Sequence, residues 1–255
     1  MKKIMIVVGH PQRHTFCEAL GNAYKEGAEA AGHNARLFLL ADMTFDPILH
    51  EGYHRTQPLE LDLQAAYETL SACDHLVIIF PLWCGDMPAL LKGFIERILQ
   101  PDLIARENSE HAMNWSIFEK KSARIVMTMG MPVSIYRFWY RGHALKLLTR
   151  NILNFIGIKP VKNTLFGMVG TAKSERHDRW VEEIRALGLP RSLLLLQSNG
   201  GAVSVEQVAA RPVMLVLSGP AAGVGALKGC ADPGAAANLI SMEIGGTSCD
   251  VMVMV

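Results

Sequence analysis

The first 190 residues combine two hydrophobic patterns, short continuous apolar runs and longer segments in which apolar residues recur every three to four positions. The run LVIIF at residues 76–80 is typical of a strand buried on both faces of a sheet, whereas ALLKGFIERIL at residues 89–99 is typical of an amphipathic helix. By these criteria strands are predicted at residues 4–8, 35–40, 76–80, 123–129 and 162–168, and helices at residues 16–31, 59–72, 89–99, 143–156 and 174–187.

The strict alternation of strands and helices predicts an α/β fold with a five-stranded parallel sheet, because parallel neighbours need a crossover connection, usually a helix. Right-handed crossovers place helices on both faces of the sheet and give a doubly wound, three-layer architecture. In such folds ligands bind beyond the carboxyl ends of the strands, near the point where the strand order reverses. Candidate functional residues are therefore expected in the loops that follow the strands.

The composition changes sharply near residue 190. All 18 aromatic residues and all nine histidines precede residue 191, and the predicted helix at 174–187 ends with the stop signals Gly188 and Pro190. We therefore predict two parts, a complete α/β domain over residues 1–190 and a small appendage over residues 191–255. The appendage has no aromatic side chain with which to fill a core.

The charge balance and the cysteines argue against several classes of protein. With 25 Lys and Arg against 24 Asp and Glu, the net charge of +1 gives no field that would attract nucleic acid or an anionic membrane. The five cysteines are an odd number without a CxxC pair, so neither a disulfide framework nor a metal site is predicted, and a cytoplasmic location is expected. No apolar run reaches the roughly 18–20 residues that a transmembrane helix needs.

The loop after the first predicted strand, GHPQRHTF at residues 9–16, is a candidate anion site. Thr15 lies at the expected N-cap of the next helix, where free amide N–H groups and the helix dipole attract negative charge, and His10 and Arg13 add donors. The alternative is that Thr15 only caps the helix and that His10 and Arg13 are solvated. The loop contains neither GxGxxG nor a Walker sequence, which argues against a Rossmann dinucleotide site and a P-loop kinase.

The loop after the third predicted strand, PLWCGDMP at residues 81–88, carries Trp83 between two prolines. A Trp in a loop is by itself more often a packing residue. Here, however, FPLWCGDMPALLKGFIERIL at residues 80–99 resembles the segment FPLxWxxxPAxLKGxxxRV of the NAD(P)H:quinone oxidoreductase family. The resemblance implies a flavodoxin-like fold and FAD or FMN as cofactor, with FAD slightly favoured. A planar flavin ring needs an apolar wall and backbone donors, which such a loop can supply.

The loop TMGMP at residues 128–132, after the fourth predicted strand, stands where this family has a Thr-Thr-Gly-Gly turn over the pyrimidine edge of the flavin. Tyr136 and His143 have the spacing of a family Tyr and His that assist the proton balance of hydride transfer, although both could simply border a helix start. The first loop also matches the family pattern of His, four variable residues, Ser or Thr, and Phe. This sequence departs from the family at Cys17, Cys84, Asp86, Met129 and Met131.

The resemblance covers residues 3–187 and implies a complete set of site residues. The implied catalytic residues are Tyr136 and His143. The implied flavin-binding residues are His10, Thr15, Phe16, Cys17, Pro81, Leu82, Trp83, Cys84, Gly85, Thr128, Met129, Gly130 and Met131.

The expected activity is a two-electron transfer in which NAD(P)H reduces the flavin, leaves, and is replaced by a quinone or similar acceptor, so that the kinetics are ping-pong. Alternatives on the same fold are an azo or nitro reductase and a regulatory subunit of a potassium efflux system. The resemblance also implies a homodimer. The apolar and aromatic residues 135–140 are a candidate contact between subunits, and the alternative is a lid or packing within the chain.

Residues 193–255 resemble an internal piece of a different family, the hydantoinase A and oxoprolinase family of ATP-dependent enzymes. The resemblance includes EIGGTSCD at residues 243–250, with Glu243 where that family has Asp, in a hairpin of an actin-like nucleotide fold whose amides can hold phosphate. These enzymes are several times longer and bind nucleotide between two lobes. We therefore expect residues 191–255 to be a non-catalytic fragment, with an ATP-dependent hydantoinase-type activity as the less favoured alternative.

Overall fold

The computed structural model describes residues 1–101, 103 and 118–188, and beyond them the backbone of residues 194–196, 202–204, 239–244 and 249–254. The chain forms two compact units, Met1–Pro190 and Arg191–Val255. None of the described helices is long and apolar enough to cross a membrane.

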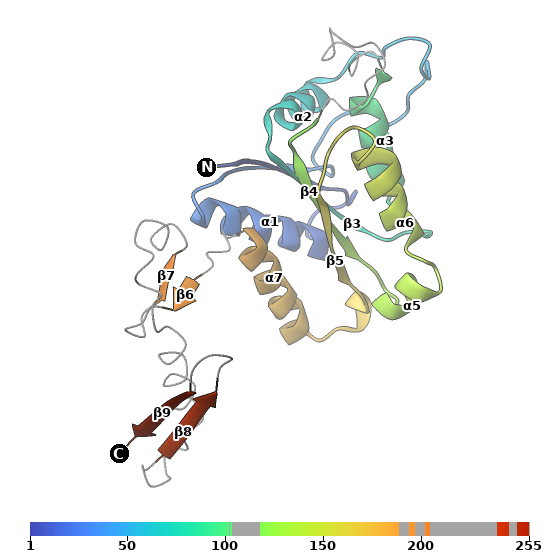
Figure 1. Ribbon diagram of the computed structural model, residues 1–255. Coiled ribbons are helices and arrows are strands. Elements are labelled where there is room, and N and C mark those ends of the chain that lie inside the picture. The colour runs from blue at the N-terminus through green and yellow to red at the C-terminus, as the bar shows by residue number, and fades with distance from the viewer. Residues whose placement is uncertain are drawn as a thin grey trace. The chain divides into compact units, whose positions relative to one another are not determined.

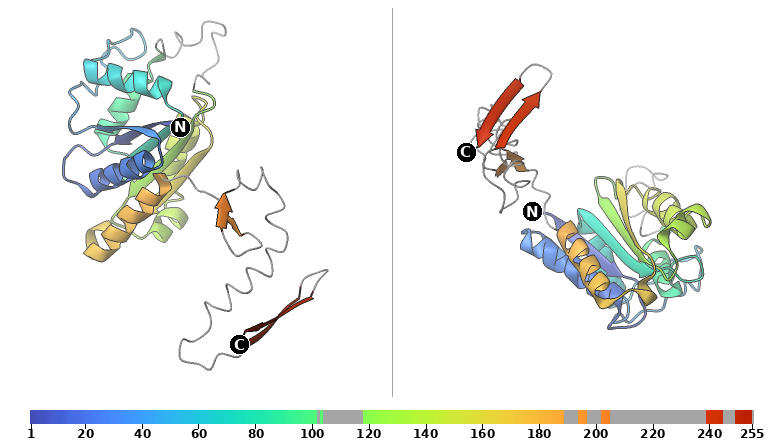
Figure 2. Two further views of the ribbon diagram at one scale, coloured as in Figure 1. Left: turned by 90° about the vertical axis from the view of Figure 1, so that its left-hand side faces the viewer. Right: turned by 90° about the horizontal axis from the view of Figure 1, so that it is seen from below.

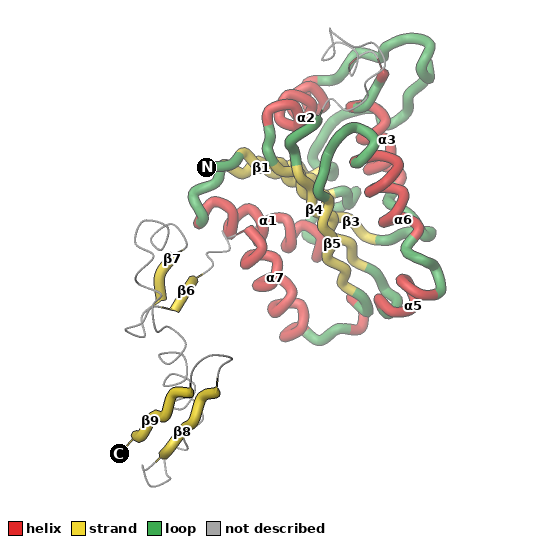
Figure 3. Tube along the Cα trace, viewed as in Figure 1, coloured by secondary structure: helices red, strands yellow, loops and turns green. Residues whose placement is uncertain are grey.

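The first unit is built on a five-stranded sheet whose strands all run parallel, in the order β2-β1-β3-β4-β5 (Figures 1 and 3). The strand order reverses at β1, which lies between β2 and β3. The predicted parallel, doubly wound sheet is therefore confirmed. The strands are β1 (Lys3–Val8), β2 (Asn34–Leu39), β3 (His75–Pro81), β4 (Ser122–Thr128) and β5 (Val161–Phe166).

Helices cover both faces of this sheet (Figures 1 and 2). Successive residues of β1 point to opposite faces, so Ile6 and Val8 join one core cluster and Met5 and Val7 join the other. The first cluster lies under α1 and α7, and the second lies under α2, α3 and the π-helix η1. These elements are α1 (Phe16–Ala30), α7 (Ser174–Gly188), α2 (Leu61–Ala72), α3 (Ala89–Ile98) and η1 (Leu147–Leu153).

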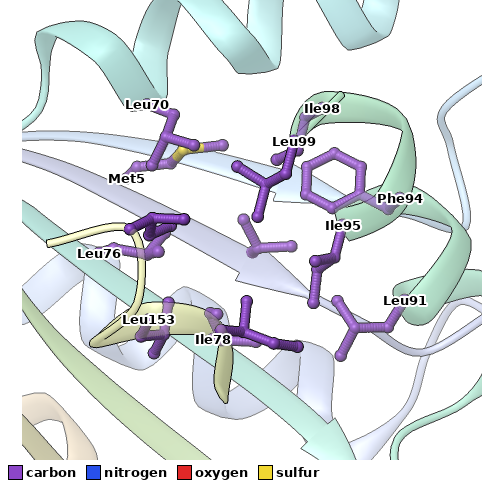
Figure 4. A pocket seen from close by; sticks show the side chains of 13 residues that line it. Met5, Leu70, Leu76, Ile78, Leu91, Phe94, Ile95, Ile98, Leu99 and Leu153 are labelled. Atoms are coloured by element: carbon purple, nitrogen blue, oxygen red, sulfur yellow. The ribbon is translucent and has the colours of Figure 1, made fainter. Parts of the chain in front are cut away.

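A cavity of about 30 Å³ lies inside the second core cluster (Figure 4). Met5, Ile78 and Leu91 surround it together with other apolar side chains from the sheet, from α2 and α3, and from η1. Its lining contains no polar side chain that could orient a ligand. The cavity is therefore a packing defect of the core.

The connection between β4 and β5 differs from the single helix predicted at residues 143–156. It contains α5 (Val133–Phe138), α6 (His143–Lys146) and the π-helix η1. At the end of η1 the Asn154 N–H donates to the Thr149 carbonyl, five residues earlier, at 2.9 Å. This wider turn brings side chains five positions apart to the same side, and Leu148 and Leu153 are both buried. An α-helix would align positions three or four apart instead.

The second unit contains two antiparallel pairs of strands, β6 with β7 and β8 with β9 (Figure 2). In the second pair Glu243 lies opposite Asp250 and Ile244 opposite Cys249. The residues of the Gly-Gly-Thr motif, 245–247, lie outside the described residues. The strands are β6 (Leu194–Leu196), β7 (Ala202–Ser204), β8 (Leu239–Ile244) and β9 (Cys249–Met254).

Candidate active site

Three loops leave the carboxyl ends of β1, β3 and β4, the strands at the centre of the sheet (Figure 3). We call residues 9–15 the first loop, residues 82–88 the second loop and residues 129–132 the third loop. Because parallel strands end at the same edge of a sheet, the three loops lie side by side. This is the edge at which doubly wound folds bind ligands.

Direct contacts join the loops to one another. The rings of His10 and Trp83 meet edge to face with their centroids 5.2 Å apart, which links the first loop to the second. The Leu82 N–H donates to the carbonyl of Thr128 at 2.8 Å, which links the second loop to the end of β4, directly before the third loop. Burial lowers the pKa of His10, so this imidazole is neutral at pH 7. The structure thus brings the three predicted loop motifs together.

The second loop is closed by a tight turn. Trp83 and Asp86 exchange both backbone hydrogen bonds at 2.9 Å, and the two residues between them, Cys84 and Gly85, have φ values of 49° and 82°. Two successive positive φ values correspond to a type I′ turn, for which glycine is favoured. Trp83 is 44% exposed beside the turn, while Pro81 at the end of β3 is buried. The loop therefore presents the indole, and not the proline, to a ligand.

The first loop ends at the N-terminus of α1, where the first N–H groups lack partners within the helix. Thr15 is the N-cap, and its hydroxyl accepts a hydrogen bond from the Glu18 N–H at 3.3 Å. The N–H groups of Phe16 and Cys17, in the first turn, have no partner within the helix. Together with the helix dipole they form an anion cradle. Capping by Thr15, the alternative weighed above, thus coexists with two further amide donors.

Arg13 is held by two carboxylates. Its Nη1 donates to Asp42 at 2.6 and 2.7 Å, and its Nη2 donates to Glu18 at 2.9 Å. The hydrogen bonds from Arg13 hold the pKa of Glu18 below its usual range. The pairing of Arg13 with Asp42 was not predicted, because Asp42 is 29 positions away along the chain. The Arg13–Asp42 ion pair therefore holds the first loop against the segment that follows β2.

The residues of the third loop differ in burial: the two methionines are buried or half-buried, whereas the glycine between them is exposed. Met129 is buried, and its N–H donates to the Phe166 carbonyl at 2.8 Å. Met131 is half-buried, and its carbonyl accepts a hydrogen bond from the Met168 N–H at 3.2 Å. Gly130 is exposed, and a Cβ added there would meet no atom within 4 Å. Gly130 is thus the point at which a planar ligand can approach the backbone closely.

Cys17 and Thr128 lie beneath the loops. Both side chains are buried, and the Cys17 Sγ lies 3.5 Å from the Thr128 Oγ1. Burial raises the pKa of the Cys17 thiol to about 11, so the group stays protonated at neutral pH. Cys17 therefore supports the site through packing and through its backbone N–H, and its sulfur is not a nucleophile.

The two predicted catalytic residues occupy different environments. Tyr136 is 2% exposed, and its Oη accepts a hydrogen bond from the Leu145 N–H at 3.1 Å. Burial raises the pKa of Tyr136, and the negative charge of Asp86 raises it further. His143 is exposed at the first residue of α6. The structure therefore buries Tyr136 in the core cluster that also contains Met87 of the second loop, and it leaves His143 open to solvent.

An aromatic cluster behind the first loop was not predicted. Phe16 contacts Phe166, His177 and Trp180, with ring centroids 6.4, 4.6 and 5.9 Å away. The spacing of His177 and Trp180, three residues apart on one helix, was the available sequence signal. The cluster fixes the start of α1, and with it the anion cradle, against α7.

The residues at this edge fit a flavin. Trp83 offers an aromatic wall, Gly130 leaves open space at the backbone, and the first turn of α1 offers free N–H groups for a phosphate. These are the three features that a planar ring carrying a phosphate tail requires.

Two family models match the chain. Residues 2–187 match the model of the flavodoxin-like fold, and residues 167–255 match the hydantoinase/oxoprolinase model. The chain is similar to an uncharacterized NAD(P)H oxidoreductase of Haemophilus influenzae, with 26% identity over 168 residues that cover 64% of this chain and 82% of that protein.

The chain is also 32% identical over 95 residues to FMN-dependent NADH:quinone oxidoreductase 1 of Hahella chejuensis, a match that covers 37% of this chain and 43% of that protein. Among solved structures, it resembles an NAD(P)H:quinone oxidoreductase from Methanothermobacter marburgensis. That likeness has a TM-score of 0.61 and 24% identity, and it covers 72% of this chain and 93% of the other. The predicted resemblances to NAD(P)H:quinone oxidoreductases and to hydantoinase A are thus confirmed.

Proposed function

Because this chain belongs to the family of proteins with the flavodoxin-like fold, we propose that it is a flavin-dependent oxidoreductase that transfers hydride from NAD(P)H to quinones or similar acceptors. One observation carries the proposal. The loops after β1, β3 and β4 meet at one edge, where an exposed Trp83, an open Gly130 and the free first turn of α1 lie together.

Each loop has a distinct part in binding. The N–H groups of Phe16 and Cys17 bind the flavin phosphate, with Thr15 and His10 beside them. Trp83, which is exposed, would offer an aromatic wall to the flavin ring. The open backbone at Gly130 of the third loop would admit the ring, and a backbone N–H there would stabilise negative charge on it.

The bound flavin supplies the two-electron chemistry, taking hydride from NAD(P)H and passing it to the acceptor. Tyr136 holds a proton at its Oη at neutral pH, because burial raises the pKa of the phenol. His143 lies exposed to water at the first residue of α6. NAD(P)H and the acceptor use the same open side of the site in turn, which gives ping-pong kinetics.

The proposal includes two features of the working protein. We expect a homodimer, as the family resemblance implies, and sedimentation equilibrium measures it. We also expect a cytoplasmic location, which agrees with the free thiols of Cys17, Cys73 and Cys84. The domain division at residue 190 and a non-catalytic role for residues 191–255 complete the proposal.

The decisive experiment is flavin binding followed by turnover. The purified protein is expected to carry flavin or to quench the fluorescence of added FAD or FMN at micromolar concentration, and chromatography of the released flavin identifies which of the two is bound. Steady-state oxidation of NADH and NADPH is then compared with quinone, azo and nitro acceptors. Flavin binding without turnover would favour the regulatory-subunit alternative. Absence of quenching by both flavins would reject the proposal.

Gly130→Val gives a matched test of the flavin position. A side chain at 130 enters open space in the free protein, so the melting temperature is expected to stay unchanged, while flavin binding weakens by at least tenfold because the ring and the side chain compete for the same volume. Gly170→Val is the control, because position 170 is equally open and lies outside the three loops. Equal flavin affinities of the two variants would place the ring elsewhere.

A further inference from the structure

The outward face of α5 is apolar although it is exposed. Ile135, Phe138 and Trp139 are spaced three and four residues apart, so their side chains form one stripe on this short helix. Their exposed fractions are 46%, 84% and 81%, and the neighbouring Tyr140 is 47% exposed. We call these four residues the α5 surface.

The other side of α5 is anchored. Tyr136 is buried, and its Oη accepts a hydrogen bond from the Leu145 N–H. The Gly142 N–H donates to the Tyr136 carbonyl at 3.1 Å, which ties the end of α5 to the start of α6. The direction in which the α5 surface points is thereby fixed. A contiguous exposed apolar patch on a rigid helix marks an interaction site.

The α5 surface lies in a basic stretch of the chain. Residues 130–174 contain seven Lys and Arg and no Asp or Glu, in a protein whose net charge is only +1. Arg137 and Arg141 flank the α5 surface, and Lys146 and Arg150 follow it. All four are exposed, and within the described part of the chain none forms an ion pair. The net charge of the whole chain does not reveal this local excess of positive charge.

We propose that the α5 surface docks on an anionic lipid membrane. Phe138 and Trp139 insert into the boundary between headgroups and acyl chains, where aromatic side chains are favoured, and Tyr140 lies at headgroup level. Arg137 and Arg141 pair with lipid phosphates. Residues 130–174 contribute no negative charge that would oppose this contact.

A second copy of the chain fits this surface less well. Two copies meeting through the same patch bring two basic stretches together, and no acidic residue within 130–174 of either copy offsets them. A lipid surface supplies the opposite charge.

Docking in this way extends the proposed function without depending on it. Pro132, the last residue of the third loop, is also the N-cap of α5. The lipid surface would therefore begin next to the candidate flavin site, at the depth where apolar quinones partition.

The first test is co-sedimentation of the full-length protein with vesicles of phosphatidylcholine, with and without phosphatidylglycerol. Binding is expected to the mixed vesicles at low salt and to fall at high salt, because the charge contacts are screened. Phe138→Ala with Trp139→Ala is expected to abolish it. Arg137→Gln with Arg141→Gln is expected to weaken it about 25-fold, or about fivefold for each arginine.

Two control variants match these changes. Tyr53→Ala with Leu61→Ala removes equally exposed apolar side chains, 73% and 85% exposed, from the segment around the start of α2. Lys159→Gln with Lys162→Gln removes two charges of the same basic stretch at the amino end of β5, away from α5. Both controls are expected to bind the mixed vesicles as the parent does. Binding lost equally in controls and test variants would overturn the proposal.

Trp139→Phe separates membrane contact from subunit contact. Brominated lipids are expected to quench the tryptophan fluorescence of the parent, and quenching is expected to disappear in Trp139→Phe although that variant still binds vesicles. Sedimentation equilibrium is run on the Phe138→Ala/Trp139→Ala protein in parallel. If the parent does not bind anionic vesicles, or if Phe138→Ala with Trp139→Ala dissociates a dimer, the α5 surface is not a lipid-docking surface.

Discussion

At the scale of single residues, burial separates the two candidate proton donors. Tyr136 is buried and keeps its proton at neutral pH, and its Oη accepts from the Leu145 N–H, an arrangement that leaves the phenolic hydrogen available as a donor. His143 is exposed and is not held in this way. A buried phenol and an accessible imidazole can act in sequence, one beside the site and the other toward water.

Tyr136→Phe and His143→Ala are therefore expected to slow flavin reduction by about tenfold or more, since a positioned acid–base group contributes roughly 10²–10⁴-fold. Flavin affinity is expected to change much less, because neither side chain lies in the three loops. Stopped-flow reduction by NADH and NADPH measures the first quantity and flavin fluorescence the second. Tyr140→Phe, at an exposed neighbour, is the control. Unchanged reduction in both variants would remove these residues from the mechanism.

His75 shows how burial couples a residue to the stability of the fold. Its Nδ1 lies 2.8 Å from the Ser122 Oγ and its Nε2 lies 3.2 Å from the Tyr24 hydroxyl, at the amino ends of the strands. Burial lowers the pKa of His75 to about 4, and the nearby Arg124 and Lys2 lower it as well. The folded protein therefore holds His75 neutral at pH values where the unfolded chain binds a proton.

Because the folded pKa lies below the unfolded value of 6.5, the free energy of unfolding is expected to fall as the pH drops below about 6.5 and to be unaffected by His75 above it. Between pH 7 and pH 5 the loss attributable to His75 is about 2 kcal/mol. Urea unfolding of the parent and of His75→Phe measures it. His75→Phe has no imidazole to protonate, so its free energy of unfolding should fall less between pH 7 and pH 5 than that of the parent. Equal losses would show that His75 is not the source of the pH dependence.

At the scale of elements, α1 and α7 cross at two glycines. A Cβ at Gly27 would lie 2.0 Å from the Arg185 carbonyl oxygen, and a Cβ at Gly188 would lie 2.6 Å from the Ala28 nitrogen. Both obstacles are backbone atoms, which cannot rotate away. The glycines therefore set the distance between the two helices, and the Arg185–Glu26 ion pair, 2.9 Å long, lies beside the crossing.

Gly27→Ala is expected to force the helices apart and to lower the free energy of unfolding by about 1–3 kcal/mol, despite the higher helix propensity of alanine. Gly170→Ala, where an added Cβ meets nothing within 4 Å, is the control and should change it by less than about 0.5 kcal/mol. Urea unfolding compares the two. A Gly27→Ala protein as stable as the parent would show that the helices can slide apart without cost.

Elements with one buried face could be predicted from the sequence, and those that break this rule could not. The helix predicted at residues 16–31 is α1, Phe16–Ala30, because its apolar residues face the core at the helical period. α5 was not predicted. Its apolar residues Ile135, Phe138 and Trp139 are exposed, so the hydrophobic pattern does not indicate which face of the helix packs on the core. The helix predicted at residues 143–156 contains η1, but its π-helical form was not predicted, because the pattern was interpreted with the α-helical period and the buried leucines of η1 are five positions apart.

The candidate site likewise has features that the sequence predicts and features that depend on the folded chain. Thr15 was expected to cap α1 and does so, because capping is decided by local sequence. The burial of Met129 and the openness of Gly130 depend on how the third loop lies against β5, which local sequence does not encode. The pairing of Arg13 with Asp42 depends on the folded chain alone.

At the scale of the whole molecule, the two family matches overlap over residues 167–187, and the structure decides to which unit this segment belongs. α7 fills most of the overlap and packs on α1 through the two glycines and the Arg185–Glu26 ion pair. Ile184 of α7 is completely buried in the core cluster beneath these helices. The segment therefore belongs to the first unit.

We predict that residues 190–255 are dispensable for flavin binding and NAD(P)H oxidation. A chain that ends at Leu189 keeps all five strands of the parallel sheet, α7 and the three loops. Its flavin affinity and its rate of NAD(P)H oxidation are expected to stay within about twofold of the full chain, because the described contacts of the three loops are made by residues of the first unit. Fluorescence titration and steady-state kinetics on the two proteins make the comparison.

Limited proteolysis of the full chain tests the same division without a truncation. Small domains of about 60 residues hide only about 60% of the surface of their unfolded chain and are marginally stable, so cleavage is expected between residues 188 and 200, with an active first unit as the product. Calorimetry with MgATP is expected to show no binding to either protein. A truncated protein that loses flavin or precipitates would show that residues 190–255 are part of the working fold, and a clear MgATP signal in the full chain alone would give them a nucleotide-binding role of their own.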